Sequence, residues 1–252
     1  MALCTLLSAG VSGSAPESVV TAPPPPEFRF ARLAYNDNSA FGGFGRFSRG
    51  GSWMTDAPEA EQHLLTGIRR LTRINTLDPL RDELIAVRPG DPDLFEYPFI
   101  YGVEVGRWYL DDQEAANLRE YLLRGGFLMV DDFHGSAQWE GFMESMRRVF
   151  PDREVVEIPD NHEVFHVLYD LDQKVQIPGV AALMSGRTYE QDGVDPHWRG
   201  VFDDTGRLMV AINFNMDLGD SWEHADTPGY PQTLTALGYR FAISYAIYAM
   251  TH

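Results

Sequence analysis

The stretch from Leu110 to Gly135, LDDQEAANLREYLLRGGFLMVDDFHG, constrains the fold of this chain more than any other segment. Asp111 stands where a helix N-cap is expected, and Glu114 follows three residues later, as in a capping box. The glycine pair at 125–126 then ends the predicted helix. The apolar run over 127–130 is short and continuous, which is typical of a strand covered on both faces. The segment therefore predicts a helix followed by a buried strand, as α/β proteins contain.

Three polar residues, Asp131, Asp132 and His134, follow this predicted strand directly. Ligands of open α/β sheets bind at the carboxyl ends of strands, so these side chains are candidates for a functional site. They could act as general acid and base or hold a cation. The alternative is turn formation, in which the aspartates accept hydrogen bonds from backbone amides. Because side chains alternate along a strand, we expect at most one of the two aspartates to face any given ligand.

The remaining segments continue the alternation of strands and helices. We expect strands over 28–35, 84–87, 95–101, 154–158 and 208–214, and helices over 56–71, 139–149 and 232–250. Pro98 interrupts one of these strands, which places it near a sheet edge or a bend. The sequence thus predicts a single α/β domain over 28–252, with a loop-rich insertion at about 159–207, behind an extended Pro-rich tail over 1–27.

Charge and cysteine content exclude several classes of function. The 252 residues have a formal net charge of -17, which argues against binding of nucleic acid or of anionic membrane surfaces. The single cysteine, Cys4, lies in the tail, so a catalytic thiol in the folded body is excluded. We expect no metal or other cofactor.

The tail over 1–27 resembles the apolar and small-residue parts of a signal peptide, although it has no Lys or Arg before its apolar stretch. We therefore weigh a periplasmic or membrane-peripheral location evenly against a cytoplasmic one. No segment reaches the roughly 20 apolar residues that span a bilayer. Through this tail we expect contact with a protein partner subunit, and through that complex a peripheral association with a membrane.

Two further groups of residues are candidates for a site. His162 and His166 have a spacing that would place both imidazoles on one side of a helix, but their neighbours do not support a firm helix. Asn215, Asp217 and Trp222 follow the predicted strand over 208–214 and form a mixture suited to a polar ligand. Together with Asp131 they are the predicted ligand-binding residues, although turn formation uses the same residue types.

Several long segments resemble the bacterial domain of unknown function 4159. The resemblance covers about 28–252 and rests on FRFARLAY, WMTDAP, FEYPFIY, YLLRGGFLMVDDFHG, NHEVFHVLYDL, GRLMVAINFNMDLGDSWE and YRFAISYAIYAMTH. It implies a flavodoxin-like three-layer α/β/α sandwich with a mostly parallel sheet, like that of class I glutamine amidotransferases and trehalose-utilisation-like proteins. In the related amidotransferases a nucleophilic cysteine follows the corresponding strand. This chain has Asp132 or Phe133 near that place, so glutamine hydrolysis through a thiol-enzyme intermediate is not expected.

Three functions remain open from the sequence. The first is a non-catalytic binding or assembly module, an accessory subunit of an exported or membrane-peripheral complex. The second is a hydrolase or lyase that uses Asp132, His134 and His162 with water or a divalent metal. The third is a carbohydrate-binding protein with Trp222 or Trp53 as a stacking platform, which requires one of these rings to be exposed.

Overall fold

A seven-stranded sheet forms the centre of the protein, in a computed structural model that describes residues 25–39, 50–79, 84–172 and 174–252. The strand order is β3-β1-β4-β6-β9-β8-β7. The first five strands of this order are parallel, and β8 and β7 continue the sheet in antiparallel fashion. The strands are β1 (Phe30–Leu33), β3 (Ala86–Val87), β4 (Phe99–Val103), β6 (Phe127–Asp131), β7 (Val156–Glu157), β8 (His197–Phe202) and β9 (Leu208–Phe214). A separate pair joins β2 (Asn36–Asp37) to β5 (Trp108–Tyr109).

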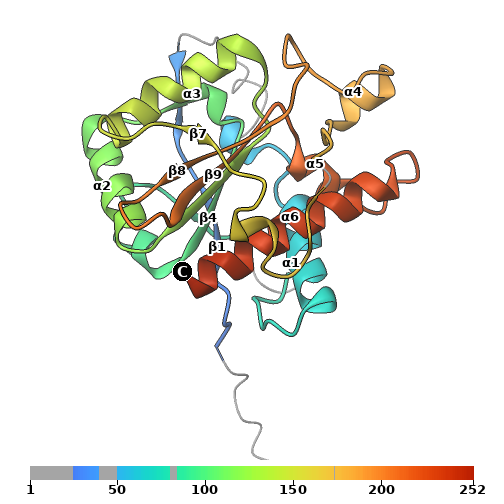
Figure 1. Ribbon diagram of the computed structural model, residues 1–252, viewed down its shortest axis with the longest axis horizontal. Coiled ribbons are helices and arrows are strands. Elements are labelled where there is room, and N and C mark those ends of the chain that lie inside the picture. Colours follow the sequence, from blue (N-terminus) through green and yellow to red (C-terminus); the bar gives the residue numbers. More distant parts are fainter. Residues whose placement is uncertain (1–24, 40–49, 80–83, 173) are drawn as a thin grey trace, which may run out of the picture.

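Helices cover both faces of the sheet (Figure 1). One layer contains α1 (Glu59–Leu71), α5 (Leu218–Glu223) and α6 (Gln232–Thr251), and the other contains α2 (Asp112–Leu123) and α3 (Gly135–Val149). Short elements complete the chain: α4 (Val180–Met184), η3 (Ser52–Met54), η4 (Pro92–Glu96), η5 (Val105–Arg107) and η6 (Glu163–Phe165). The protein is therefore an α/β protein with a mostly parallel mixed sheet between helices, consistent with a three-layer sandwich, as the sequence predicts.

The alternation of side chains along β6 divides the core into two clusters. Phe127 and Met129 pack with the layer that contains α6, whereas Leu128 and Val130 pack with α2 and α3. All four side chains are at most 1% exposed. The continuous apolar run in the sequence therefore reflects burial on both faces of a central strand.

The predicted capping box at the start of α2 is confirmed. Asp111 Oδ1 accepts hydrogen bonds from the backbone N–H of Gln113 and Glu114, at 2.9 and 2.8 Å. Glu114 Oε2 in turn accepts from the backbone N–H of Asp111 at 3.1 Å. Gly125, with φ 110, follows the helix in the left-handed conformation that favours glycine. The helix and the strand after it are thus where the sequence predicts them, although β6 extends one residue beyond the predicted run, to Asp131.

Pro98 lies at a bend, one of the two expected positions: it directly precedes β4, which lies between β1 and β6 inside the sheet, and its carbonyl accepts a hydrogen bond from the N–H of Phe127. One expectation differs from the structure. The strand β8 lies within the segment that we expect to be loop-rich, because its six residues alternate polar and apolar character too briefly to stand out among Asp and Gly. None of the described helices combines the length and the apolar character that crossing a membrane requires. Residues 1–24 of the predicted tail lie outside the described residues.

Candidate functional site

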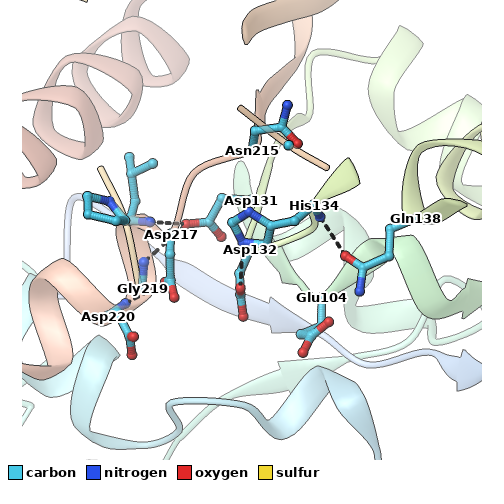
Figure 2. A network of polar contacts seen from close by, with 12 residues as sticks. Glu104, Asp131, Asp132, His134, Gln138, Asn215, Asp217, Gly219 and Asp220 are labelled. Carbon is cyan, nitrogen blue, oxygen red and sulfur yellow. Dashed lines mark hydrogen bonds and ion pairs between the residues drawn. The ribbon is translucent and has the colours of Figure 1, made fainter. Parts of the chain in front are cut away.

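The three central parallel strands each end at a polar residue with unusual backbone geometry. Glu104 follows β4, Asp132 follows β6 and Asn215 follows β9, with φ values of 53, 51 and 62°. Non-glycine residues in this left-handed region are uncommon and cluster at functional sites. Because neighbouring parallel strands end at the same edge of a sheet, these residues lie near one another beyond the strand ends, in the region that we call the crevice (Figure 2).

Asp131 is the last residue of β6 and is fully buried. Its Oδ2 accepts hydrogen bonds from the backbone N–H of Leu218 and Gly219, at 2.7 and 3.1 Å, in the first turn of α5. Its Oδ1 has no hydrogen-bond partner. Burial raises the pKa of this carboxyl to about 7, opposed by the hydroxyl of Tyr101 and by the two backbone N–H groups.

Asp132 leaves the regular strand because of its left-handed backbone, and its N–H donates to the carbonyl of Met216 at 2.9 Å. The alternation that we expected therefore breaks between the two aspartates. Both act electrostatically on Asp217, whose pKa is raised well above its ordinary value by burial and then by Asp132, with a smaller effect of Asp131. Asp131 faces the first turn of α5, whereas Asp132 lies beside His134.

His134 lies beside Asp132, with 3.3 Å between Nε2 and Oδ1. It is 3% exposed, precedes α3, and its backbone N–H donates to Oε1 of Gln138 at 2.5 Å. Burial lowers the pKa of the imidazole to about 4, and its Nδ1 has no hydrogen-bond partner. The imidazole is therefore neutral at physiological pH.

Further carboxyls surround this pair, and Figure 2 shows those of Glu104, Asp132, Asp217 and Asp220 pointing to the same side. One oxygen each of Asp56, Asp217 and Asp220 lies within 4.8 Å of the others. Burial, and then the neighbouring Asp220, raises the pKa of Asp56 well above its ordinary value. Burial raises the pKa of Glu104 to about 7 against the opposing charge of Arg107. We call Asp56, Asp131, Asp132, Asp217 and Asp220 the acidic cluster.

Comparison with known proteins places almost the whole chain in one family. Residues 29–250 match the family described as "Domain of unknown function (DUF4159)". The chain belongs to the DUF4159 family. No curated protein matches the sequence. The DUF4159 match runs from β1 to α6, so every residue of the acidic cluster lies within the family domain.

Asp56 of this DUF4159 chain is a member of the acidic cluster that comes from a distant part of the sequence and was not predicted as a site residue, since the sequence indicated only that it begins a helix; in the structure it precedes the N-cap Pro58. A buried ion pair between Arg32 on β1 and Glu61 on α1 orders the backbone before it. Arg32 Nη1 donates to the carbonyls of Trp53 and Thr55, at 2.8 and 2.5 Å. The packing of α1 against α5 brings this segment to Asp217 and Asp220. Glu104 and Asp220 were also not predicted as site residues, although Asp220 lies between the predicted residues Asp217 and Trp222.

The predicted residues Asn215 and Asp217 both bind backbone groups in this DUF4159 chain. Asn215 uses both amide atoms: its Oδ1 accepts from Gly135 at 2.9 Å and its Nδ2 donates to the carbonyl of Asp195 at 2.7 Å. It therefore joins the start of α3 to the segment before β8. Asp217 caps α5 by accepting from the N–H of Asp220 at 2.8 Å, and its second oxygen is not used in this cap.

Trp222 and His162 do not line the crevice. The ring of Trp222 is fully buried against Tyr101, with 5.5 Å between ring centroids, so it offers no stacking platform; Trp53 is half-buried. His162 packs against Phe202 and Tyr248, whose hydroxyl accepts from Leu208 at the start of β9. His162 therefore lies at the opposite end of the sheet from Asp132, and the spacing of His162 and His166 does not form a site with it.

Proposed function

We propose that this protein is a hydrolase or lyase whose proton-transfer pair is Asp132 and His134. The observation that supports this proposal most strongly is the contact of 3.3 Å between the two side chains, at a left-handed turn beyond a central strand. Asp132 is 8% and His134 3% exposed, so the pair is nearly withdrawn from water. Such withdrawal strengthens each electrostatic interaction inside a site.

The protonation states of the pair suit general acid–base chemistry. Burial, and then Glu104 and the other carboxyls, raises the pKa of Asp132 well above its ordinary value, which favours the protonated acid. Burial lowers the pKa of His134, which favours the neutral base. Asp132 is thus a proton donor and His134 a proton acceptor under the same conditions. A pair of groups whose environments shift their pKa values in this way is typical of an acid–base site.

We also propose the finer fold relationship, to flavodoxin-like and class I glutamine amidotransferase-like proteins. The support is the turn between β6 and α3, where a residue with positive φ follows the strand as in a nucleophile elbow. Here that residue is Asp132, which is neither a thiol nor a hydroxyl. In this proposal water is the nucleophile: neutral His134 accepts a proton from water as it attacks, and protonated Asp132 donates a proton to the leaving group.

A screen with chromogenic esters, phosphoesters and glycosides tests the proposed reaction class. We expect turnover of one class by the full chain, and a loss of at least about 100-fold in kcat for Asp132→Asn and for His134→Gln. The control is Asp112→Asn, which removes a side chain that is 99% exposed on α2. Turnover that both site variants retain, or no turnover of any class, contradicts the proposal.

A second candidate is the assembly module, an accessory subunit of an exported or membrane-peripheral complex. It is favoured by a group of exposed apolar side chains between β7 and β8: Leu168, Val175, Met184 and Val194, of which Met184 is 85% exposed. Exposed apolar side chains become buried when a partner binds over them, which favours association. Native mass spectrometry of the protein from its source is expected to show a complex that Met184→Asp weakens. A free monomer in the cytoplasmic fraction contradicts this candidate.

A further inference from the structure

We propose that Asp56, Asp217 and Asp220 bind a divalent cation with oxygen ligands beside the proton-transfer pair. The three carboxylates come from two segments that are far apart in the sequence and meet at the start of α1 and of α5. Cation binding can be measured without any substrate, so the inference stands or fails independently of the proposed reaction.

The carboxyl oxygens converge around two glycines that leave room for them. A Cβ at Gly219 would lie 2.5 Å from Asp56 Oδ2 and 3.5 Å from Asp217 Oδ1. A Cβ at Gly179 would lie 2.7 Å from Asp217 Oδ2 and 3.2 Å from Asp220 Oδ2. Any other residue at these positions would displace the carboxylates, so the two glycines permit the close approach of acidic side chains.

Buried oxygen atoms without hydrogen-bond partners also point to a ligand here, and this observation does not depend on the charge of the acidic cluster. Tyr101 Oη and Asp131 Oδ1 belong to side chains that are 0% exposed; the Tyr101 hydroxyl lowers the pKa of Asp131, but neither atom makes a hydrogen bond of normal geometry to a described group. Asp56 Oδ2 is also buried without one. Tyr101 Oη would lie 2.8 Å from the same Cβ at Gly219, so it points to the place where the carboxylates meet. Native proteins pair almost all buried polar atoms, which indicates a missing partner at this place.

No positive side chain neutralises this group among the residues that the structure describes. Arg32 approaches but is paired with Glu61, and no Lys or Arg there forms an ion pair with Asp56, Asp217 or Asp220. Three carboxylates within 4.8 Å repel one another unless protons or a cation lie between them. Carboxylate oxygens are the ligands of Mg²⁺, Mn²⁺ and Ca²⁺, whereas Zn²⁺ and Cu²⁺ prefer nitrogen and sulfur.

Asp220 also belongs to a second group, with Glu223 and His224, which is more exposed. His224 Nε2 lies 3.6 Å from Asp220 Oδ1. A cation held there would use a nitrogen ligand and would not need Asp56. The variants Asp56→Asn and His224→Gln therefore separate the proposed site from this alternative.

The experiment titrates the full chain with Mn²⁺ after removal of metal ions with a chelator, and follows free Mn²⁺ by electron paramagnetic resonance. Mg²⁺ and Ca²⁺ are added as competitors to rank the three ions. We expect one Mn²⁺ per chain, with an affinity that Asp56→Asn lowers at least about tenfold because it removes one charged ligand. His224→Gln and Asp112→Asn are expected to retain the affinity within about twofold.

The Asp56→Asn variant is expected to fold normally, because Asp56 Oδ2 accepts no hydrogen bond in the protein. We expect this variant to raise the melting temperature of the metal-free protein while it lowers the affinity for Mn²⁺. The inference is overturned if the protein binds no Mn²⁺ below millimolar concentration. It is also overturned if His224→Gln abolishes Mn²⁺ binding and Asp56→Asn does not. Binding of Mn²⁺ without turnover of any substrate class would contradict the proposed function alone, and turnover without binding would contradict this inference alone.

Discussion

At the scale of single residues, the crevice depends on side chains that serve both the fold and the site. Asp131 illustrates this: one carboxyl oxygen holds the first turn of α5, and the other has no partner. Burial raises the pKa of its carboxyl to about 7, so the free energy of unfolding falls when this carboxyl ionises. Hydrogen bonding and charge at this position are separable by substitution.

We predict opposite effects for two substitutions of Asp131. Asp131→Asn keeps an oxygen that accepts from the N–H groups of Leu218 and Gly219, but it has no proton to lose. In the wild type, the stability that the raised pKa of Asp131 contributes is lost as pH rises from about 3.8 towards 7. The variant is therefore expected to stabilise the metal-free protein at pH 8 by about 1–3 kcal/mol, with a smaller effect at pH 5. Asp131→Ala leaves two buried N–H groups unpaired and is expected to cost about 2–4 kcal/mol at both pH values. Urea unfolding at the two pH values measures both; destabilisation by Asp131→Asn at pH 8 would refute this reading.

At the scale of elements, the sequence predicts those structures whose signals are local. The capping box of α2, the glycine after it and the apolar run of β6 lie within 26 consecutive residues, so their helix and strand could be predicted. The left-handed turn at Asp132 could not be predicted, because it depends on the hydrogen bond between its N–H and Met216. Asp56 joins the crevice through the packing of α1 against α5, two helices that are far apart in the sequence. The sequence patterns therefore predicted the site residues that follow β6, but not Asp56, which lies before α1.

The capping box yields a prediction at this scale. Asp111→Ala removes the acceptor of two backbone N–H groups and is expected to lower the free energy of unfolding by about 1 kcal/mol. Asp112→Asn, in the same turn, is the control and is expected to change it by only a few tenths of a kcal/mol. Thermal unfolding of both variants checks this. Equal effects of the two substitutions would show that the capping box contributes nothing beyond charge.

At the scale of the whole molecule, the buried ionisable groups make stability depend on pH in opposing ways. Asp131 and Glu104, whose pKa values burial raises to about 7, bind more protons in the folded state, so their contribution to stability is lost as pH rises from about 4 to 7. His134, whose pKa burial lowers to about 4, destabilises the folded state as pH falls from 6.5 towards 4. Two carboxyls outweigh one imidazole over this range.

The metal-free protein is therefore expected to be more stable at pH 5 than at pH 8, by about 2–4 kcal/mol. Chemical denaturation at the two pH values measures this difference. The double variant Asp131→Asn, Glu104→Gln is expected to reduce it, because two of the carboxyls with a raised pKa then no longer titrate. A wild-type protein that is more stable at pH 8 than at pH 5 without added cations would contradict this account of the crevice.

The most direct test of the claim that this crevice is a cation-binding functional site is a crystal structure of the full chain soaked in Mn²⁺, with anomalous diffraction data. The account predicts one strong anomalous peak at about 2.2 Å from a carboxylate oxygen of each of Asp56, Asp217 and Asp220. An absent peak at this place, or peaks only at exposed carboxylates elsewhere on the protein, would contradict it.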